Sequence, residues 1–170
     1  MPGLLARIDP MELSTVRIKI PEGCNVILGQ SHFIKTVEDL YEIIVGTAPQ
    51  MKFGLAFNEA SQHRLIRHDG NDEKLEDLAI EFAELIGAGH IFVVVMRDGF
   101  PINVLPRIKD CQEVVRIFCA TANPLEVIVA QTEQGRGVVG VIDGESPLGV
   151  EGPDEIAARN GFLRAIGYKR

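Results

Sequence analysis

Ile91-Phe92-Val93-Val94-Val95-Met96 is an uninterrupted apolar run with turn-forming residues at both ends. A strand with one solvated face alternates polar and apolar side chains, whereas this run offers apolar side chains to both faces. It therefore predicts a central strand in a sheet that other elements cover on both sides.

Helical periodicity marks several segments around this strand. Thr36 and Asp39 have the spacing of a capping box, so the first helix is expected to begin at Thr36. Asn71-Asp72 opens the second helix, and Gly87 ends it. The predicted helices cover residues 36–45, 73–86 and 108–119 and a last segment opened by Pro153, with a proline-punctuated loop over 98–106.

Strand patterns lie between these helices. Residues 15–20 alternate polar and apolar side chains strictly, which predicts a half-buried strand. Further strands are expected over 25–28, 52–58, 125–130 and 138–142, with an extended segment over 63–67. Because no linker or repeat divides the series, we expect one layered α/β (α+β) domain over residues 11–170. Its sheet is expected to be mixed, with helices flanking it.

The first residues and the composition limit the class of protein. Residues 1–10 are expected to form an irregular extension, with Met11 as an alternative natural start. The 170 residues carry a formal charge of −7, so neither a broad nucleic-acid surface nor a membrane surface is expected. The three cysteines have no disulfide or metal-binding spacing and fit a reducing cytoplasm.

A glycine-rich turn lies between two β-branched runs in residues 131–144. Gly135, Gly137 and Gly140 spell G-x-G-x-x-G, and such glycines let backbone N–H groups approach a phosphate. A dinucleotide-binding fingerprint must open a helix, whereas a second strand is predicted here. The lysine and aspartates of protein kinases are also missing downstream. The segment therefore predicts either a phosphate-binding hairpin or an ordinary β-hairpin.

Several blocks of the sequence together have the pattern of a known family. They are GQSHFIKTVEDLY at 29–41, RLIRH at 64–68, FPINVL at 100–105, EVVRIF at 113–118, ATANP at 120–124, RGVVGVIDG at 136–144 and SPLGV at 146–150. From Met11 to about Glu151 the chain resembles the adenosine-specific kinase family of archaea and thermophilic bacteria. This resemblance implies that the chain binds adenosine, AMP or ATP, transfers a phosphoryl group and forms a homotrimer.

Residues 30–35 are the richest candidate block for this chemistry, because a strand there passes into a helix N-terminus that favours anions. Phosphoryl transfer needs positive charge around the transferred oxygens and an orienting group near the nucleophile. Lys35 can hold a phosphate, His32 can accept a proton, and Gln30 and Ser31 add polar groups. The alternative is a solvated Lys35 outside the helix cap and a hydrogen-bonded His32 in a loop.

Other candidates for ligand contacts lie in the second half of the chain. Arg116, Asn123 and Arg136 can each reach an anionic ligand at an edge of the sheet, or lie as ordinary surface groups. Gly137 and Gly140 are expected to contact a phosphate if the hairpin binds one.

A carboxylate that can hold Mg²⁺ follows the second hairpin strand. Asp143, with Glu145 or Glu151, can bind the Mg²⁺ that accompanies ATP, because Mg²⁺ on phosphates commonly uses one or two carboxylates. An Asp-Gly turn is the alternative role for Asp143.

Two other classes of function stay open. A non-catalytic adenine-nucleotide sensor, or an oligomeric regulatory module, would bind the same ligands without chemistry. A stable oligomeric scaffold without a small ligand would make the polar block at residues 30–35 incidental. Only the enzyme hypothesis predicts that changing Lys35 or His32 abolishes turnover while adenosine affinity largely survives.

Overall fold

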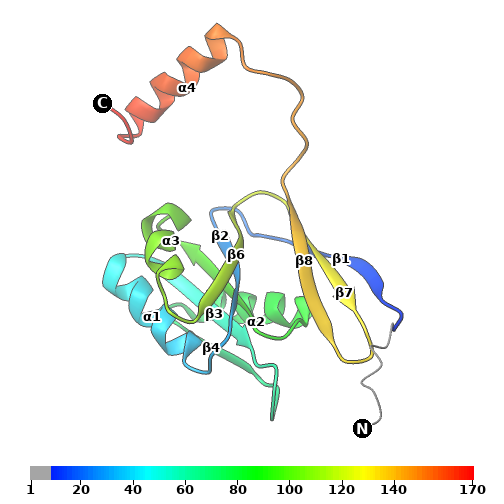
Figure 1. Ribbon diagram of the computed structural model, residues 1–170. Coiled ribbons are helices and arrows are strands. Elements are labelled where there is room, and N and C mark those ends of the chain that lie inside the picture. Colours follow the sequence, from blue (N-terminus) through cyan, green and yellow to red (C-terminus); the bar gives the residue numbers. More distant parts are fainter. Residues whose placement is uncertain (1–8) are drawn as a thin grey trace.

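The computed structural model describes residues 9–170, so the expected extension over residues 1–10 lies almost wholly outside the described part. Within that part the chain forms eight strands and four helices (Figure 1). The main sheet contains β2 (Asn25–Ser31), β3 (Lys52–Asn58), β4 (Ile66–Gly70), β5 (Ile91–Arg97) and β6 (Val114–Thr121). Their order in space is β4-β3-β5-β2-β6.

β5 is the central strand of the main sheet and pairs with β3 on one side and β2 on the other. Val93 and Val95 pack into one apolar cluster, whereas Val94 and Met96 pack into a second one. Every residue of 91–96 is buried. The expectation of a central strand covered on both faces is confirmed.

Helices and a second sheet cover the two faces. On one face lie α1 (Thr36–Thr47) and α3 (Pro101–Lys109). The other face is covered by α2 (Glu73–Ile86) and by a three-stranded sheet. The strands of this sheet are, in their order in space, β1 (Glu12–Ile18), β7 (Leu125–Gln131) and β8 (Arg136–Asp143).

The expected class, an α/β (α+β) domain with flanking helices, is confirmed, but the expected mixed sheet is replaced by two antiparallel ones. All strand pairs in the described residues are antiparallel. The physical reason lies in the β3–β4 hairpin, which reverses the chain before α2. The strand that returns after α2 therefore runs antiparallel to β3.

The expected loop over 98–106 and the expected helix over 108–119 are both wrong. Residues 101–109 form α3, because Pro101 occupies its first position, where a missing N–H is tolerated. The side chain of Asn103 also accepts a hydrogen bond from the backbone N–H of Phe100 at 2.8 Å. Residues 114–121 form β6. β-branched residues at 114, 115 and 117 favour an extended chain, and pairing with β2 stabilises it.

The helix ends match the sequence at α2 and differ at α1. Asp72 accepts a hydrogen bond from the N–H of Leu75 at 3.3 Å, and Gly87 ends α2 with a left-handed φ of 60°. At α1 the flanking residue is Lys35, whose side chain makes no cap hydrogen bond. Thr36 is already helical, and its hydroxyl donates back to a carbonyl of the preceding turn. The expected capping box therefore does not form.

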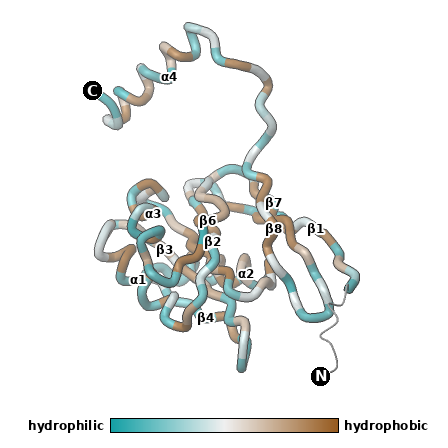
Figure 2. The backbone as a smooth tube through the Cα atoms, in the orientation of Figure 1, coloured by the Kyte–Doolittle hydropathy of each residue, from teal (hydrophilic) through white to brown (hydrophobic). Residues whose placement is uncertain are grey.

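Residues 145–170 form a C-terminal arm that leaves the two sheets. An extended segment leads to α4 (Pro153–Ala165), which stands apart from the rest of the chain (Figure 1). No side chain of α4 is buried. Along the arm, apolar residues are interspersed with polar ones, whereas they concentrate on the strands of the two sheets (Figure 2). The arm thus presents apolar surface without a core of its own.

Candidate functional site

The turn between β2 and α1 places the polar block of residues 30–35 at one end of the main sheet. Ser31 is fully buried, and its Oγ lies 2.6 Å from Thr36 Oγ1 and donates to the carbonyl of Glu113 at 3.0 Å. The backbone N–H of His32 donates to the same carbonyl at 3.1 Å. Ser31 therefore holds the turn in place, while the side chain of His32 is exposed to solvent.

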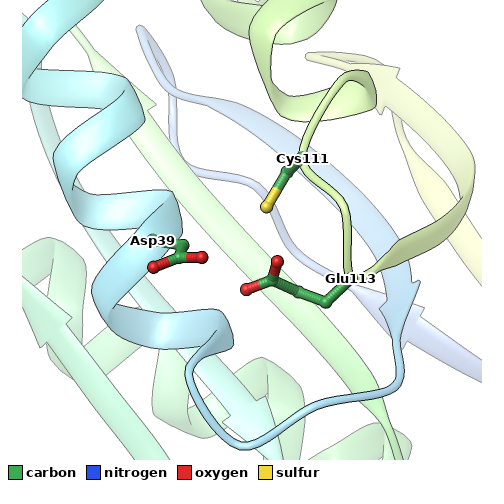
Figure 3. A group of neighbouring side chains, drawn as sticks. All are labelled: Asp39, Cys111 and Glu113. Carbon is green, nitrogen blue, oxygen red and sulfur yellow. The ribbon is translucent and has the colours of Figure 1, made fainter.

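Lys35 bridges two carboxylates beside this turn. Its Nζ lies 2.5 Å from Asp39 Oδ2 and 3.8 Å from Glu113 Oε2. Figure 3 shows the two carboxylates facing each other, with the thiol of Cys111 next to them. The hydrogen bond to Asp39 raises the pKa of Lys35, so its ammonium group is charged at neutral pH.

Glu113 is a carboxylate with almost no contact with solvent. Its side chain is 1% exposed, and neither carboxylate oxygen has a hydrogen-bond partner of normal geometry among the described residues. The pKa of the Cys111 thiol is raised to about 11. Burial of the thiol is the main cause, and contact with the Glu113 carboxylate adds to it. The chain between α3 and β6 thus places a carboxylate and a neutral thiol against the first turn of α1.

The pairing of β2 with β6 places Arg116 opposite Gln30. Arg116 is exposed, and its guanidinium group lies 5.9 Å from the ring centre of Phe118. Side chains alternate between the faces of a strand, so Gln30 and Ser31 point to opposite faces of the main sheet. The structure brings five of the predicted residues to this end of the sheet: Gln30, Ser31, His32, Lys35 and Arg116.

His90 connects the turn to a cleft at the same end of the sheet. The N–H of Ser31 donates to the carbonyl of His90 at 2.9 Å, and the N–H of His90 donates to the carbonyl of Asn58 at 2.7 Å. His90 has a φ of 62°, a left-handed conformation that few residues other than glycine adopt. Its ring stacks on Phe57 with centroids 5.9 Å apart. These contacts hold a strained residue between the turn and the cleft.

The cleft has a volume of about 660 Å³ and lies between the end of α2, the β3–β4 loop and the β7–β8 hairpin. This size is typical of small-ligand sites. Polar residues in its wall include Asn58, Glu59, Arg64 and Arg136. Glu59 is paired with Arg67, whereas the guanidinium group of Arg64 has no partner within residues 9–170. The cleft therefore offers an unpaired cation to a ligand.

Arg136 joins the hairpin to the end of α2. Its Nη1 donates to two carbonyls of the last helical turn at 3.2 and 3.3 Å, and its Nε donates to Gln131 Oε1 at 2.8 Å. A cation at a helix C-terminus satisfies free carbonyls and complements the helix dipole. Gly137 lines the cleft beside it, whereas Gly140 lies farther along β8, outside the lining.

Asn123 and Asp143 lie at the opposite end of the main sheet from His32. Thr121 pairs with Val26 near the start of β2, while His32 follows the end of that strand. Asp143 Oδ1 accepts hydrogen bonds from Thr121 Oγ1 at 2.6 Å and from Asn123 Nδ2 at 3.1 Å. These side chains tie the end of β8 to the turn after β6, and the structure does not bring them to the turn or the cleft.

Sequence reasoning did not assign a role at the site to five residues. They are Asp39, Arg64, His90, Cys111 and Glu113. Asp39 lies far from Cys111 and Glu113 in the sequence, and folding alone brings the three together. No sequence motif therefore predicts this cluster. The left-handed backbone of His90 has no signature in the sequence. Arg64 begins the segment RLIRH at 64–68, but nothing in that segment distinguishes an unpaired arginine from a paired one.

The chain is thus an α+β protein whose main sheet has, at one end, a cleft of a size typical of small-ligand sites and a turn that carries Lys35. The family model for adenosine specific kinase matches residues 16–169. The chain therefore belongs to the adenosine-specific kinase family, which supports an adenosine-related kinase function in general terms.

A solved structure is similar to this chain over nearly its whole length. The crystal structure of the PH1918 protein from Pyrococcus horikoshii OT3 has 43% sequence identity and a TM-score of 0.91, and the match covers 95% of this chain and 99% of that one. None of the curated proteins gives a significant match. Within residues 9–170, no helix has both the length and the apolar character to cross a membrane.

Proposed function

We propose that this chain transfers a phosphoryl group from ATP to adenosine or AMP. The observation that carries the proposal is the position of the exposed His32 and of the Lys35 ammonium group at the start of α1, at the same end of the sheet as the cleft. Cations and helix N-termini both favour phosphate. Membership of the family supports an adenosine ligand.

The cleft is the proposed site of the nucleoside. Asn58 in its wall donates through Nδ2 to the carbonyls of Ala83 and Ala88 at 2.9 and 3.0 Å, which determines the orientation of the amide. Its buried Oδ1 has no partner among the described residues. Such an acceptor is costly to leave unsatisfied, and the exocyclic amine of adenine is a suitable donor. Arg64 can pair with the phosphate of AMP.

The distance between cleft and turn suits a nucleotide. Asn58 ends β3 and Ser31 ends β2, with β5 between them. Two strand spacings amount to about 10 Å, which a nucleotide with its base in the cleft can span. We therefore place the transferred phosphoryl group near His32, with His90 lying along the path.

The proposed reaction forms a bond between an acceptor oxygen and the terminal phosphorus of ATP and breaks the bond from that phosphorus to ADP. When the ribose hydroxyl attacks, His32 accepts its proton and later releases it to solvent. Lys35 neutralises charge on the transferred oxygens, and Gln30 and Arg116 orient the phosphate from the adjoining strands.

Mg²⁺ that arrives with ATP would neutralise the donor phosphates. Asp143 stays a candidate ligand, because both of its hydrogen bonds go to Oδ1 and a second oxygen is available. Its position at the opposite end of the main sheet from His32 argues against this role within one chain. If Asp143 holds Mg²⁺, Asp143→Asn should raise the Mg²⁺ concentration needed for half-maximal rate; an unchanged requirement would leave Asp143 with its structural role.

We also propose a cytoplasmic homo-oligomer, with a trimer as the expected size. α4 has 13 residues and buries none of its side chains, and isolated helices of such length are marginal in water. Phe162, Ile166 and Tyr168 of the arm face Phe100 and Ile102 across a cleft of about 700 Å³. The chain thus carries both halves of an apolar contact that a second copy can complete.

The free thiols of all three cysteines accord with a reducing compartment.

The experiment that tests the function incubates nucleotide-stripped protein with Mg²⁺-ATP and a panel of nucleosides and monophosphates. Products are separated by chromatography for the wild type, His32→Ala and Lys35→Ala. Lys52→Ala is the matched control, because Lys52 is an exposed lysine at the opposite end of β3 from Asn58. Adenosine affinity of each variant is measured by calorimetry.

Phosphorylation confined to adenosine or AMP, lost in both site variants and kept in Lys52→Ala, is the expected result. Adenosine affinity should change little in all three. Tight adenine-nucleotide binding without product would overturn the kinase proposal and leave a sensor. Acid-labile phosphate on His32 would change its role from proton acceptor to nucleophile.

A further inference from the structure

Glu113 is a buried carboxylate that has no role in the proposed phosphoryl transfer. A carboxylate that is 1% exposed normally accepts several hydrogen bonds, yet within the described part of the chain no donor reaches either oxygen of Glu113 with normal hydrogen-bond geometry, and only the weakly donating thiol of Cys111 lies against it. The nearest cation is Lys35, at 3.8 Å. An ionised group in this position is costly unless a closer positive charge compensates it.

Two further potential ligands lie around this carboxylate. Single ligand atoms of Asp39, Cys111 and Glu113 all lie within 4.8 Å of one another. They come from the first turn of α1 and from the loop between α3 and β6, and they converge on one point (Figure 3). Two oxygens and one sulfur around a shared centre form a donor set for a metal ion.

Lys35 lies at the entrance to this cluster. It is bonded to Asp39, and its side chain is 37% exposed, whereas those of Cys111 and Glu113 are buried. A long lysine side chain can move its ammonium group into solvent without disturbing the backbone. The Lys35 ammonium group therefore balances the charge of the two carboxylates, and its movement into solvent would open a path for a cation into the cluster.

We infer that Asp39, Cys111 and Glu113 form a binding site for one divalent transition-metal ion of the zinc class, with Lys35 displaced towards solvent when the ion enters. The ion binds one oxygen from each carboxylate and the sulfur of Cys111, and the thiol proton passes to solvent. Two carboxylates, one thiolate and a divalent cation then have a net charge of −1, the same as two carboxylates, a thiol and the Lys35 ammonium.

The donor set selects the class of metal. Thiolate is a soft ligand that suits zinc, cobalt(II) or iron(II), whereas Mg²⁺ prefers oxygen ligands alone. Three protein ligands leave a fourth tetrahedral position for water, as in catalytic zinc sites rather than closed structural ones. The inference concerns metal binding and does not rest on the proposed phosphoryl transfer.

The test titrates chelator-treated, reduced full-length protein with Co²⁺. Binding through a thiolate produces a sulfur-to-cobalt charge-transfer band in the near ultraviolet, and calorimetry gives the stoichiometry. The wild type is expected to bind one equivalent with this band, and Zn²⁺ is expected to remove the band by competition. Cys111→Ser should lose the band, and Glu113→Gln should weaken binding while nearly preserving the shape of the side chain.

Two matched variants separate the site from general effects. Cys24→Ala removes another buried thiol and should keep the band. Lys35→Met removes the competing cation and should bind Co²⁺ more tightly than the wild type. Circular dichroism and thermal unfolding establish that each variant is folded. No stoichiometric binding to the wild type, a band that survives Cys111→Ser, or weaker binding by folded Lys35→Met would each overturn the inference.

Discussion

The backbone N–H of Ser31 donates to the carbonyl of His90 at 2.9 Å, which ties the end of β2 to the residue before β5. The N–H of His90 reaches Asn58 at the end of β3 in the same way. One residue with a left-handed backbone thus holds three strand ends together. Because the His32 turn and the cleft lie on either side of it, a disturbance at His90 should affect both.

His90→Ala is expected to lower the free energy of unfolding by about 1 kcal/mol, because the stacking on Phe57 is lost while the left-handed backbone is retained. Turnover should fall as well, since the ring no longer packs on Phe57 to steady the backbone hydrogen bonds of residue 90 to the turn and to the end of β3. Urea unfolding and the product assay measure the two effects. His63→Ala, an exposed loop variant, is the control. Wild-type stability and turnover in His90→Ala would contradict this account.

Gly137→Leu is expected to weaken adenosine binding about tenfold or more, equivalent to about 1.4 kcal/mol. A Cβ on Gly137 meets nothing within 4 Å, so the longer side chain can enter the cleft without straining the fold. Gly140→Leu is the matched control, because Gly140 has equally open surroundings on the same strand but does not line the cleft. Calorimetry compares the affinities. Equal weakening by both substitutions would place the nucleoside elsewhere.

Deletion of residues 145–170 is expected to convert the proposed oligomer into a monomer that stays folded. The arm contributes no buried side chain from α4, so both cores keep their residues. Light scattering coupled to size-exclusion chromatography gives the mass, and thermal unfolding at several concentrations tests for loss of concentration dependence. If the shortened chain keeps the mass of the oligomer, the contact between copies lies elsewhere.

Asp72→Asn is expected to lower stability at neutral pH by less than about 1 kcal/mol, because asparagine still caps α2 but cannot pair with Arg97. Burial opposes ionisation of Asp72, yet the Leu75 N–H and Arg97 together lower its pKa. A lowered folded-state pKa stabilises the fold above the pKa of the unfolded chain, and this contribution is lost as pH falls through the folded value. The difference between wild type and variant should therefore begin to shrink near pH 4, the pKa of the unfolded chain, and vanish below the lowered pKa of the folded state. A difference that persists in acid would exclude the charge as its cause.

Much of the framework could be predicted from local patterns. The run at 91–96, the helix from Asp72 to Gly87 and the hairpin of β7 and β8 all depend on periodicity and turn residues, which act over a few positions. Residues 101–121 could not be predicted in this way. The prolines of this segment indicate a loop, although Pro101 also suits a helix start, and the apolar spacing after residue 108 fits either a helix or a strand until β2 provides a partner.

The candidate site also contains features that local patterns predict and features that they do not. Local sequence patterns were enough to predict the turn with His32 and Lys35, because a strand that passes directly into a helix brings its polar residues to a helix N-terminus. Three other features depend on the folded chain: Arg136 caps α2, Asp143 lies away from His32, and Glu113 lies close to Asp39. These relationships join residues far apart in the chain, and the packing of helices and strands around the buried sheet sets them, while local patterns extend over only a few neighbours.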